Sequence, residues 1–193
     1  MIIGFMGAIG AGKSTAAEYL RAHSGFRVVS FATPLKNMVK KITPDGLINK
    51  VRDRALLQFI GTDYYRGIDD NYWLQIYRET VQNAGMLGFA VATDDARFDN
   101  EFDLIKSQYD GHLVWLDGGE EVQKRIEIRD GHVTVGIAGH ASESGLRRDD
   151  PRIDFHINNR GTTDELFDSL DTLIKQIEIQ RPLPNRDYLL QAR

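Results

Sequence analysis

Cysteine is absent from this chain of 193 residues, and its absence narrows the chemistry that the chain can perform. Without cysteine there is no disulfide framework, no thiolate nucleophile and no cysteine-based zinc site. The five histidines do not indicate a metal site either. His132 and His140 share an expected loop but lack the spacing of metal ligands. A chain without cysteine fits a reducing cytosol, so we expect a cytoplasmic protein.

Positive net charge and long apolar runs are missing as well. The formal net charge is −4 and the pI is near 5.7, so the overall field does not favour a nucleic-acid polymer as partner. No stretch approaches the roughly 20 apolar residues of a membrane span, and the first residues, MIIGFMGAIGAGKST, lack the basic segment of a signal sequence. We therefore expect no membrane partner, and a phosphate ligand must meet a local cationic pocket.

The composition is otherwise that of an ordinary globular protein, with 41% apolar and 27% charged residues. The length predicts one domain over residues 1–193. Strand-like runs alternate with runs of helical period, which predicts a parallel sheet flanked by helices. The expected strands are 2–6, 26–31, 88–93, 112–117 and 153–158, and the expected helices are 13–23, 98–108 and one that starts at Thr162.

The last of these helices has the clearest start signal. Thr162 is followed by Glu165 at the position of a capping box, in which each side chain bonds the other residue's backbone N–H. The buried stripe of this helix is predicted to be Leu166, Leu170, Leu173, Ile174 and Ile177.

Two long segments interrupt the alternation of strands and helices. Residues 34–86 are mainly helical and longer than a crossover needs, although the part from 61 to 73, GTDYYRGIDDNYW, has no helical spacing. Residues 118–150 contain six glycines and four arginines with little period. We predict that they form a mobile excursion from the fold.

The strongest chemical signal is GAIGAGKS at residues 7–14, which satisfies GxxxxGK(S/T) between an expected strand and an expected helix. Glycines let the backbone curl so that consecutive N–H groups point at phosphate, and the helix N-terminus adds its positive end. Lys13 would reach the β- and γ-phosphates, and the Ser14 hydroxyl would ligate Mg²⁺. A glycine-rich turn without a ligand is the alternative, but it would not need the lysine and serine. We assign ATP binding to Gly7, Ala8, Gly10, Ala11, Gly12, Lys13, Ser14 and Thr15.

Asp94 and Asp95 form a second signal, because they follow the apolar run FAVAT and ligands of α/β sheets gather at the carboxyl ends of strands. One carboxylate there could hold Mg²⁺, directly or through Ser14. The alternative is a solvated acidic turn. Ser14, Asp94 and Asp95 are therefore the candidate metal-site residues.

Arginines supply a third signal, because planar guanidinium groups engage two phosphate oxygens at once. Arg66 and Arg97 are candidates, although a lone arginine is usually a solvated surface residue. Arg125, Arg129 and the pair at 147–148 lie in the glycine-rich segment, where a lid could bring cations over a transferring phosphoryl group. The alternative for these is an ordinary charged surface.

Taken together, these motifs make the chain resemble the bacteriophage deoxynucleoside monophosphate kinases, a branch of the P-loop nucleoside-monophosphate kinase fold. Nearly the whole chain takes part in the resemblance. It rests on GFMGAIGAGKST, SFATPLK, LLQFIGTDYYRGIDDNYW, ATDDARFDNE, HASESGL and IDFHINNRGTTDEL. It implies a three-layer α/β P-loop kinase with a parallel sheet flanked by helices, a helical acceptor-binding insertion over about 34–86 and a lid over about 118–150.

The resemblance also implies roles for individual residues. On the acceptor side it implies that Lys36, Arg66 and Arg97 hold the acceptor phosphate, that Trp73 belongs to the acceptor half, and that Asp95 fills the acidic position of the DxRFxNE segment. On the donor side it places Asn158 near the donor base and makes Arg125 and Arg129 lid arginines. Together with the P-loop, this assigns catalysis to Lys13, Arg97 and Arg129.

The expected reaction is transfer of the γ-phosphoryl group of ATP, with Mg²⁺, to a deoxynucleoside monophosphate in the host cytoplasm of a phage. The resemblance leaves room for a homodimer. Two kinases of the same fold, dephospho-coenzyme A kinase and phosphomevalonate kinase, stay open as alternatives, because they share the P-loop and the lid. A non-catalytic ATP-dependent switch is also an open alternative, because a P-loop indicates that a protein binds a nucleotide but not that it catalyses a reaction.

Overall fold

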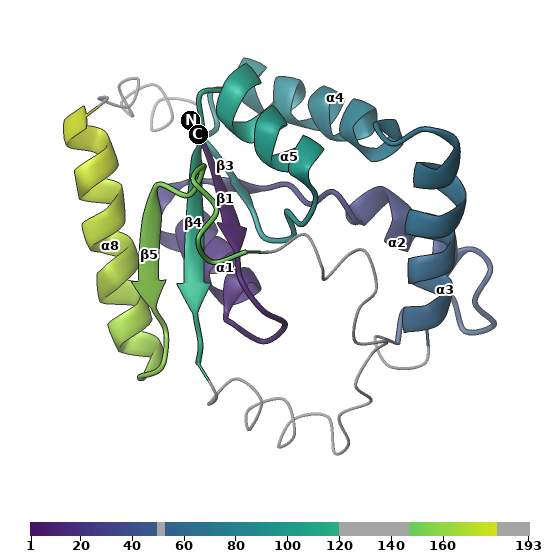
Figure 1. Ribbon diagram of the computed structural model, residues 1–193, viewed down its shortest axis with the longest axis horizontal. Helices are drawn as coiled ribbons and strands as arrows, with labels where there is room; N and C mark the ends of the chain where they lie inside the picture. Colours follow the sequence, from purple (N-terminus) through teal and green to yellow (C-terminus); the bar gives the residue numbers. More distant parts are fainter. Residues whose placement is uncertain (50–52, 120–146, 181–193) are drawn as a thin grey trace, which may run out of the picture.

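The computed structural model describes residues 1–49, 53–119 and 147–180 (Figure 1). Within these residues one sheet has the strand order β2-β3-β1-β4-β5, and all neighbouring strands are parallel, as the alternation of strands and helices predicts. Strand β1 lies at the centre, so the glycine-rich loop that follows it starts in the middle of the carboxyl edge. The strands are β1 (Ile2–Met6), β2 (Arg27–Val28), β3 (Val91–Thr93), β4 (His112–Asp117) and β5 (Phe155–Asn158).

Helices cover both faces of the sheet and make the fold three layers deep. Because side chains alternate along a strand, Ile3 and Phe5 of β1 pack in the core beneath α1 (Lys13–Ser24) and α8 (Thr163–Gln180). Ile2 and Met6 pack in a second core, which includes residues of α4 (Tyr72–Met86), α5 (Asp99–Asp103) and η2 (Leu104–Gln108). The three-layer α/β expectation is confirmed.

The capping box at the start of α8 is present. The Thr162 N–H donates to Glu165 Oε2 at 2.8 Å, and the Glu165 N–H donates to Thr162 Oγ1 at 3.3 Å. The predicted stripe of the helix is buried at every position, namely Leu166, Leu170, Leu173, Ile174 and Ile177. Within the described ranges, no helix combines the length and the apolar character that a membrane span requires.

Several elements are shorter than the sequence pattern predicts. Strand β2 covers two residues of the expected 26–31, and at the end of that range the Phe31 N–H bonds the Asp95 carboxylate rather than a neighbouring strand. The expected helix 98–108 is divided into the α-helical α5 and the π-helical η2. Strands β3 and β5 match only the last residues of their predicted ranges.

Between β2 and β3 the chain forms a helical insertion made of α2 (Thr33–Lys40), α3 (Arg54–Gln58), η1 (Phe59–Arg66) and α4. The segment that shows no helical spacing in the sequence is helical in its first part, because η1 is a π-helix whose wider turn does not fit a period of 3.6. Trp73 Nε1–H fixes this turn by donating to the Gly61 carbonyl at 2.8 Å. Leu35, Val39 and Trp73 form the insertion's own small core.

The predicted excursion over 118–150 lies mostly outside the described residues, as do Arg125 and Arg129. Of its four arginines, Arg147 and Arg148 are described, and Arg148 Nη2 lies 3.2 Å from Asp117 Oδ2 at the end of β4.

Candidate active site

The loop between β1 and α1 has a conformation that requires glycine. Gly7 has φ of 135° and Gly12 has φ of 94°, values that other residues rarely adopt. A side chain at Gly7 would meet the Leu116 carbonyl oxygen at 2.5 Å, and one at Gly12 would overlap the amide of Asn159. The backbone can therefore curl close to its neighbours, as phosphate binding by consecutive N–H groups requires.

Lys13 and Ser14 stand at the first turn of α1, where the P-loop meets the helix. The Lys13 ammonium donates to the carbonyl oxygens of Gly7 at 2.7 Å and Ala8 at 2.8 Å, so it spans the loop that precedes it. The Ser14 hydroxyl donates to Asp94 Oδ2 at 2.6 Å. The Lys13 ammonium thus contacts the loop, and the hydroxyl of Ser14 is joined to a carboxylate from the segment after β3.

The pair of Ser14 and Asp94 fits a magnesium site. Both offer oxygen atoms, the ligands that Mg²⁺ prefers, and they lie at the start of a helix where phosphates would bind. Among the described residues no cluster of three or more His, Asp or Glu side chains could hold a metal ion. Magnesium does not need one, because it usually keeps several waters and phosphate oxygens and takes only one or two protein ligands.

Asp95 faces a different part of the cleft. Its Oδ1 accepts the Phe31 N–H at 2.9 Å, and its Oδ2 accepts the Ala32 N–H at 2.9 Å together with the Ser30 hydroxyl. All three donors lie just before α2. The carboxylate therefore holds the start of that helix. Of the two neighbouring aspartates, Asp94 contacts the segment after β1 and Asp95 contacts the segment after β2.

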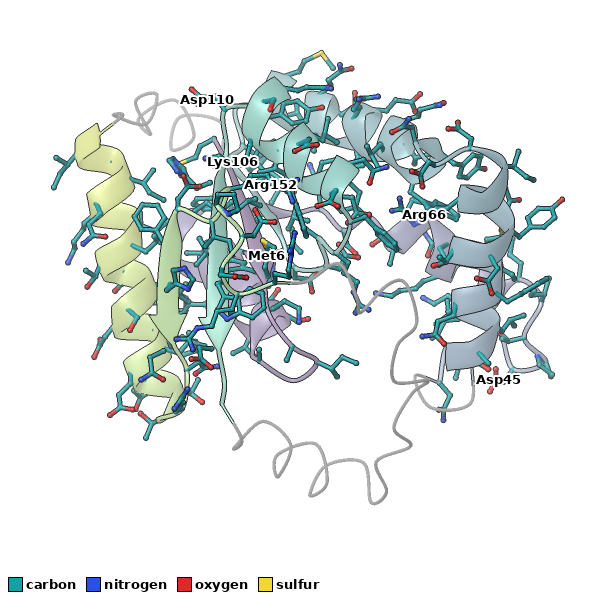
Figure 2. All side chains as sticks on the ribbon, in the orientation of Figure 1. Met6, Asp45, Arg66, Lys106, Asp110 and Arg152 are labelled. Carbon is teal, nitrogen blue, oxygen red and sulfur yellow. The ribbon has the colours of Figure 1, made fainter. Side chains whose placement is uncertain are left out.

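Arg66 is buried at the end of η1, with 9% of its surface exposed. Its Nη2 forms an ion pair with Glu101 Oε1, its Nη1 donates to the Asp70 carbonyl at 3.1 Å, and its guanidinium lies 3.9 Å from the ring centroid of Phe98. Figure 2 shows Arg66 on the side of the insertion that faces the sheet. The arginine is fixed from several directions, so its position does not depend on a ligand.

Glu101 connects this arginine to the segment after β3. Its Oε2 accepts the N–H groups of Arg97 at 2.7 Å and Phe98 at 3.2 Å, while its Oε1 meets Arg66. Only 2% of the residue is exposed, and this burial raises the pKa of Glu101 to about 7, against the opposing effect of the Arg66 charge. Glu101 is a residue that the sequence reasoning missed, although its place three residues after Phe98 is that of a helix N3 carboxylate.

One cleft of about 450 Å³ joins the P-loop to the helical insertion. At the P-loop end it is lined by Gly10, Gly12, Lys13, Ser14, Thr15 and Asp94. Toward the insertion it is lined by Lys36, Arg66, Trp73, Asp95, Arg97 and Glu101, with Leu35, Leu57, Gln58 and Thr62 beyond the residues that the sequence predicted. The structure thus brings predicted residues of both groups to one cleft, although Gly7, Ala8 and Ala11 do not line it.

Asn158 is outside this cleft, and its neighbour contacts the P-loop instead. The Asn158 side chain is exposed and accepts the N–H of Arg160 at 3.2 Å. Asn159 is buried, and its Nδ2 donates to the Ala11 carbonyl at 2.9 Å. The sequence does not indicate this role of Asn159, because the contact joins residues 148 positions apart.

A relative from Acanthamoeba polyphaga mimivirus, provisionally named a deoxynucleotide monophosphate kinase, is 32% identical over 143 residues. The match covers 61% of this chain and 74% of the relative. No known protein-family model matches the chain.

Solved kinase structures share the fold. A sugar kinase from Janibacter sp. HTCC2649 has a TM-score of 0.59 at 18% identity, with 90% of this chain and 94% of that chain covered. Shikimate kinase from Acinetobacter baumannii has a TM-score of 0.52 at 17% identity, with 92% and 94% covered. These identities show the fold alone, while the mimivirus match shows the family. The chain therefore belongs to the family of that mimivirus relative, within the P-loop kinases.

Proposed function

We propose that this P-loop kinase transfers the γ-phosphoryl group of ATP to a deoxynucleoside monophosphate, giving the deoxynucleoside diphosphate and ADP. The observation that carries the proposal is a shared cleft, which has a P-loop at one end and the cationic side chains of Lys36, Arg66 and Arg97 toward the other. A transfer between two phosphate groups needs such a pair of anion sites facing one another. The name of the mimivirus relative points to the same acceptor.

On the donor side, the N–H groups of the P-loop and the Lys13 ammonium would neutralise charge on the β- and γ-phosphates of ATP. Ser14 and Asp94 would hold Mg²⁺, which would supply positive charge to offset that of the phosphates. Asn158, Arg125 and Arg129 stay proposals for the donor base and the lid. Asn158 lies at the carboxyl end of β5, next to the asparagine that contacts the P-loop.

On the acceptor side, Lys36 is the side chain best able to meet a phosphate. It lines the cleft from α2, and its ammonium has no hydrogen bond or ion pair with any described residue. Asp95 supports the start of the helix that carries it. Arg66 is already oriented by Glu101, and Arg97 has its backbone held by the same carboxylate. A dianionic phosphate would therefore meet cations whose positions are mostly set in advance.

The chemistry follows from positioning and charge. The attacking oxygen of a nucleoside monophosphate is already anionic at neutral pH, so the transfer needs neither a strong general base nor a covalent enzyme intermediate. The chain contributes alignment of the two phosphates and cations that stabilise the charge in the transition state. Among the described side chains, Lys13 and Arg97 are assigned this stabilisation of charge. Trp73 lines the same cleft.

An assay of ADP release across the four deoxynucleoside and four ribonucleoside monophosphates tests the proposal. We expect ATP turnover that depends on at least one deoxynucleoside monophosphate, with the diphosphate formed in equal amount. Slow hydrolysis that no acceptor changes would instead indicate an ATP-dependent switch. Turnover only with dephospho-coenzyme A or phosphomevalonate would assign the acceptor to another kinase class of the same fold.

A further inference from the structure

Two polar side chains in the cleft have no partner among the residues that the structure describes. Gln58, the last residue of α3, and Thr62, in η1, both line the cleft and are partly exposed. Neither side chain forms a hydrogen bond with any residue in the described ranges. Arg66, Asp95 and Trp73 line the same space but are bound by protein groups. Gln58 and Thr62 are therefore available to a ligand.

Gln58 and Thr62 lie on the same side of the insertion. They are one helical turn apart, so both can face the cleft from neighbouring turns. Between them, Gly61 packs directly on α2, since a side chain there would meet Leu35 Cδ2 at 2.5 Å. Trp73 fixes the same turn through the Gly61 carbonyl. The amide and the hydroxyl are thus presented from a rigid part of the insertion.

The position of these groups suits the base of a nucleotide rather than its phosphate. An acceptor phosphate must approach the P-loop, so the rest of the nucleotide extends along the cleft toward α2 and α3. Figure 1 shows α3 on the opposite side of the molecule from α8. Around Gln58 the cleft is lined by the aliphatic side chains of Leu35 and Leu57. An uncharged amide beside an apolar wall is the chemistry that recognises a planar base.

We propose that Gln58 determines base selectivity by hydrogen bonding the edge of the acceptor's base, with Thr62 as a second contact. The inference rests on the proposed function, because it assigns part of the same acceptor site. A carboxamide offers an N–H donor and a carbonyl acceptor side by side. It can therefore form a paired hydrogen bond with a base edge that has an adjacent acceptor and donor.

Two substitutions at this position separate base recognition from packing. Gln58→Leu keeps the approximate volume but removes both hydrogen-bonding groups. We expect kcat/KM to fall by about 3- to 10-fold for the preferred base and less for the others, which corresponds to loss of a neutral hydrogen bond. Gln58→Glu offers acceptors only, and guanine is the base whose pairing edge carries adjacent N–H donors. This variant should shift the ratio of kcat/KM toward dGMP by a similar factor.

The experiment measures kcat/KM for the four deoxynucleoside monophosphates and KM for ATP, with thermal unfolding of each variant. Gln82→Leu is the matched control, because Gln82 is exposed on α4 and does not line the cleft. A changed base profile with an unchanged KM for ATP supports the inference. An unchanged profile, or an equal fall for all four bases, overturns it. If the wild-type protein phosphorylates no nucleotide, the proposed function fails first, and the two failures are thereby distinguished.

Discussion

The Arg66 guanidinium and the Glu101 carboxylate form a buried ion pair that joins the helical insertion to the segment after β3. Arg66 is 9% exposed and Glu101 is 2% exposed, so neither charge is compensated by water. Because Glu101 also accepts the Arg97 N–H, one carboxylate positions two of the arginines assigned to the acceptor site.

The first prediction concerns pH. Burial raises the pKa of Glu101 to about 7 from an ordinary 4.5, so between these values the folded state binds more protons than the unfolded state. The contribution of Glu101 to the free energy of unfolding should therefore decrease as pH rises from 4.5 to 7. Denaturant unfolding at several pH values measures this slope. Glu101→Gln cannot titrate and should lose that part of the slope; an identical slope in the variant would show that Glu101 does not titrate there.

The second prediction separates binding from stability on the acceptor side. Lys36 has no partner among the described residues, so Lys36→Met should raise KM for the acceptor by about tenfold or more, as loss of a charged hydrogen bond implies. Its unfolding free energy should stay near that of the wild type. Arg66→Met should also raise this KM, but it removes the buried partner of Glu101, which should lower the free energy of unfolding by about 1–3 kcal/mol.

Measurement of KM for both substrates, with unfolding curves, decides between these outcomes. KM for ATP should change little in either variant. If Lys36→Met instead weakens ATP and leaves the acceptor unaffected, the lysine belongs to the donor side. If Arg66→Met is as stable as the wild type, the ion pair is not an important structural contact.

The third prediction concerns Lys13. Its ammonium lies within hydrogen-bonding distance of two carbonyl oxygens of the P-loop, where it can meet the charge that grows on the transferred group. Lys13→Ala should therefore lower kcat by about 10²- to 10³-fold, the usual effect of removing one such electrostatic group. ATP affinity, measured by equilibrium binding, should fall less than kcat. A folded variant with near-normal turnover would contradict the catalytic assignment.

Local patterns made the fold and the P-loop predictable from the sequence. Strand β4 and the α8 capping box depend on residues next to one another, and both match the predicted positions. The Arg66 contact with Glu101 spans 35 residues, so no local period indicates it. The contact of Asn159 with the Ala11 carbonyl is also not predictable from local patterns, because it joins residues 148 positions apart.

The strand order explains the different contacts of Asp94 and Asp95. Strand β3 lies between β1 and β2 in the sheet, so side chains that follow it can reach toward either neighbour. Asp94 meets Ser14 in the loop after β1, whereas Asp95 meets the backbone after β2. The sequence showed that an acidic pair ends a strand, but not which neighbouring strand lies on which side.

The last prediction compares the same substitution, aspartate to asparagine, at Asp94 and at Asp95. Asp94→Asn keeps a hydrogen-bond acceptor for Ser14 but removes the negative charge beside it, so about 10- to 100-fold more Mg²⁺ should be needed for half-maximal ADP release. Asp95→Asn replaces one acceptor of the bonds to Phe31 and Ala32 with a donor, which should lower the free energy of unfolding by about 1–3 kcal/mol. Its magnesium requirement should stay near that of the wild type.

Magnesium titrations at saturating ATP and acceptor, together with denaturant unfolding, measure both effects in both variants. The two substitutions are chemically identical and adjacent in the chain, so a difference between them reflects what each side chain touches. If Asp95→Asn shifts the magnesium requirement and Asp94→Asn does not, the metal lies on the α2 side and Ser14 is not its ligand. Equal shifts in both variants would mean that the requirement follows the total charge of the cleft, because charge acts over a distance that spans both aspartates, whereas coordination does not.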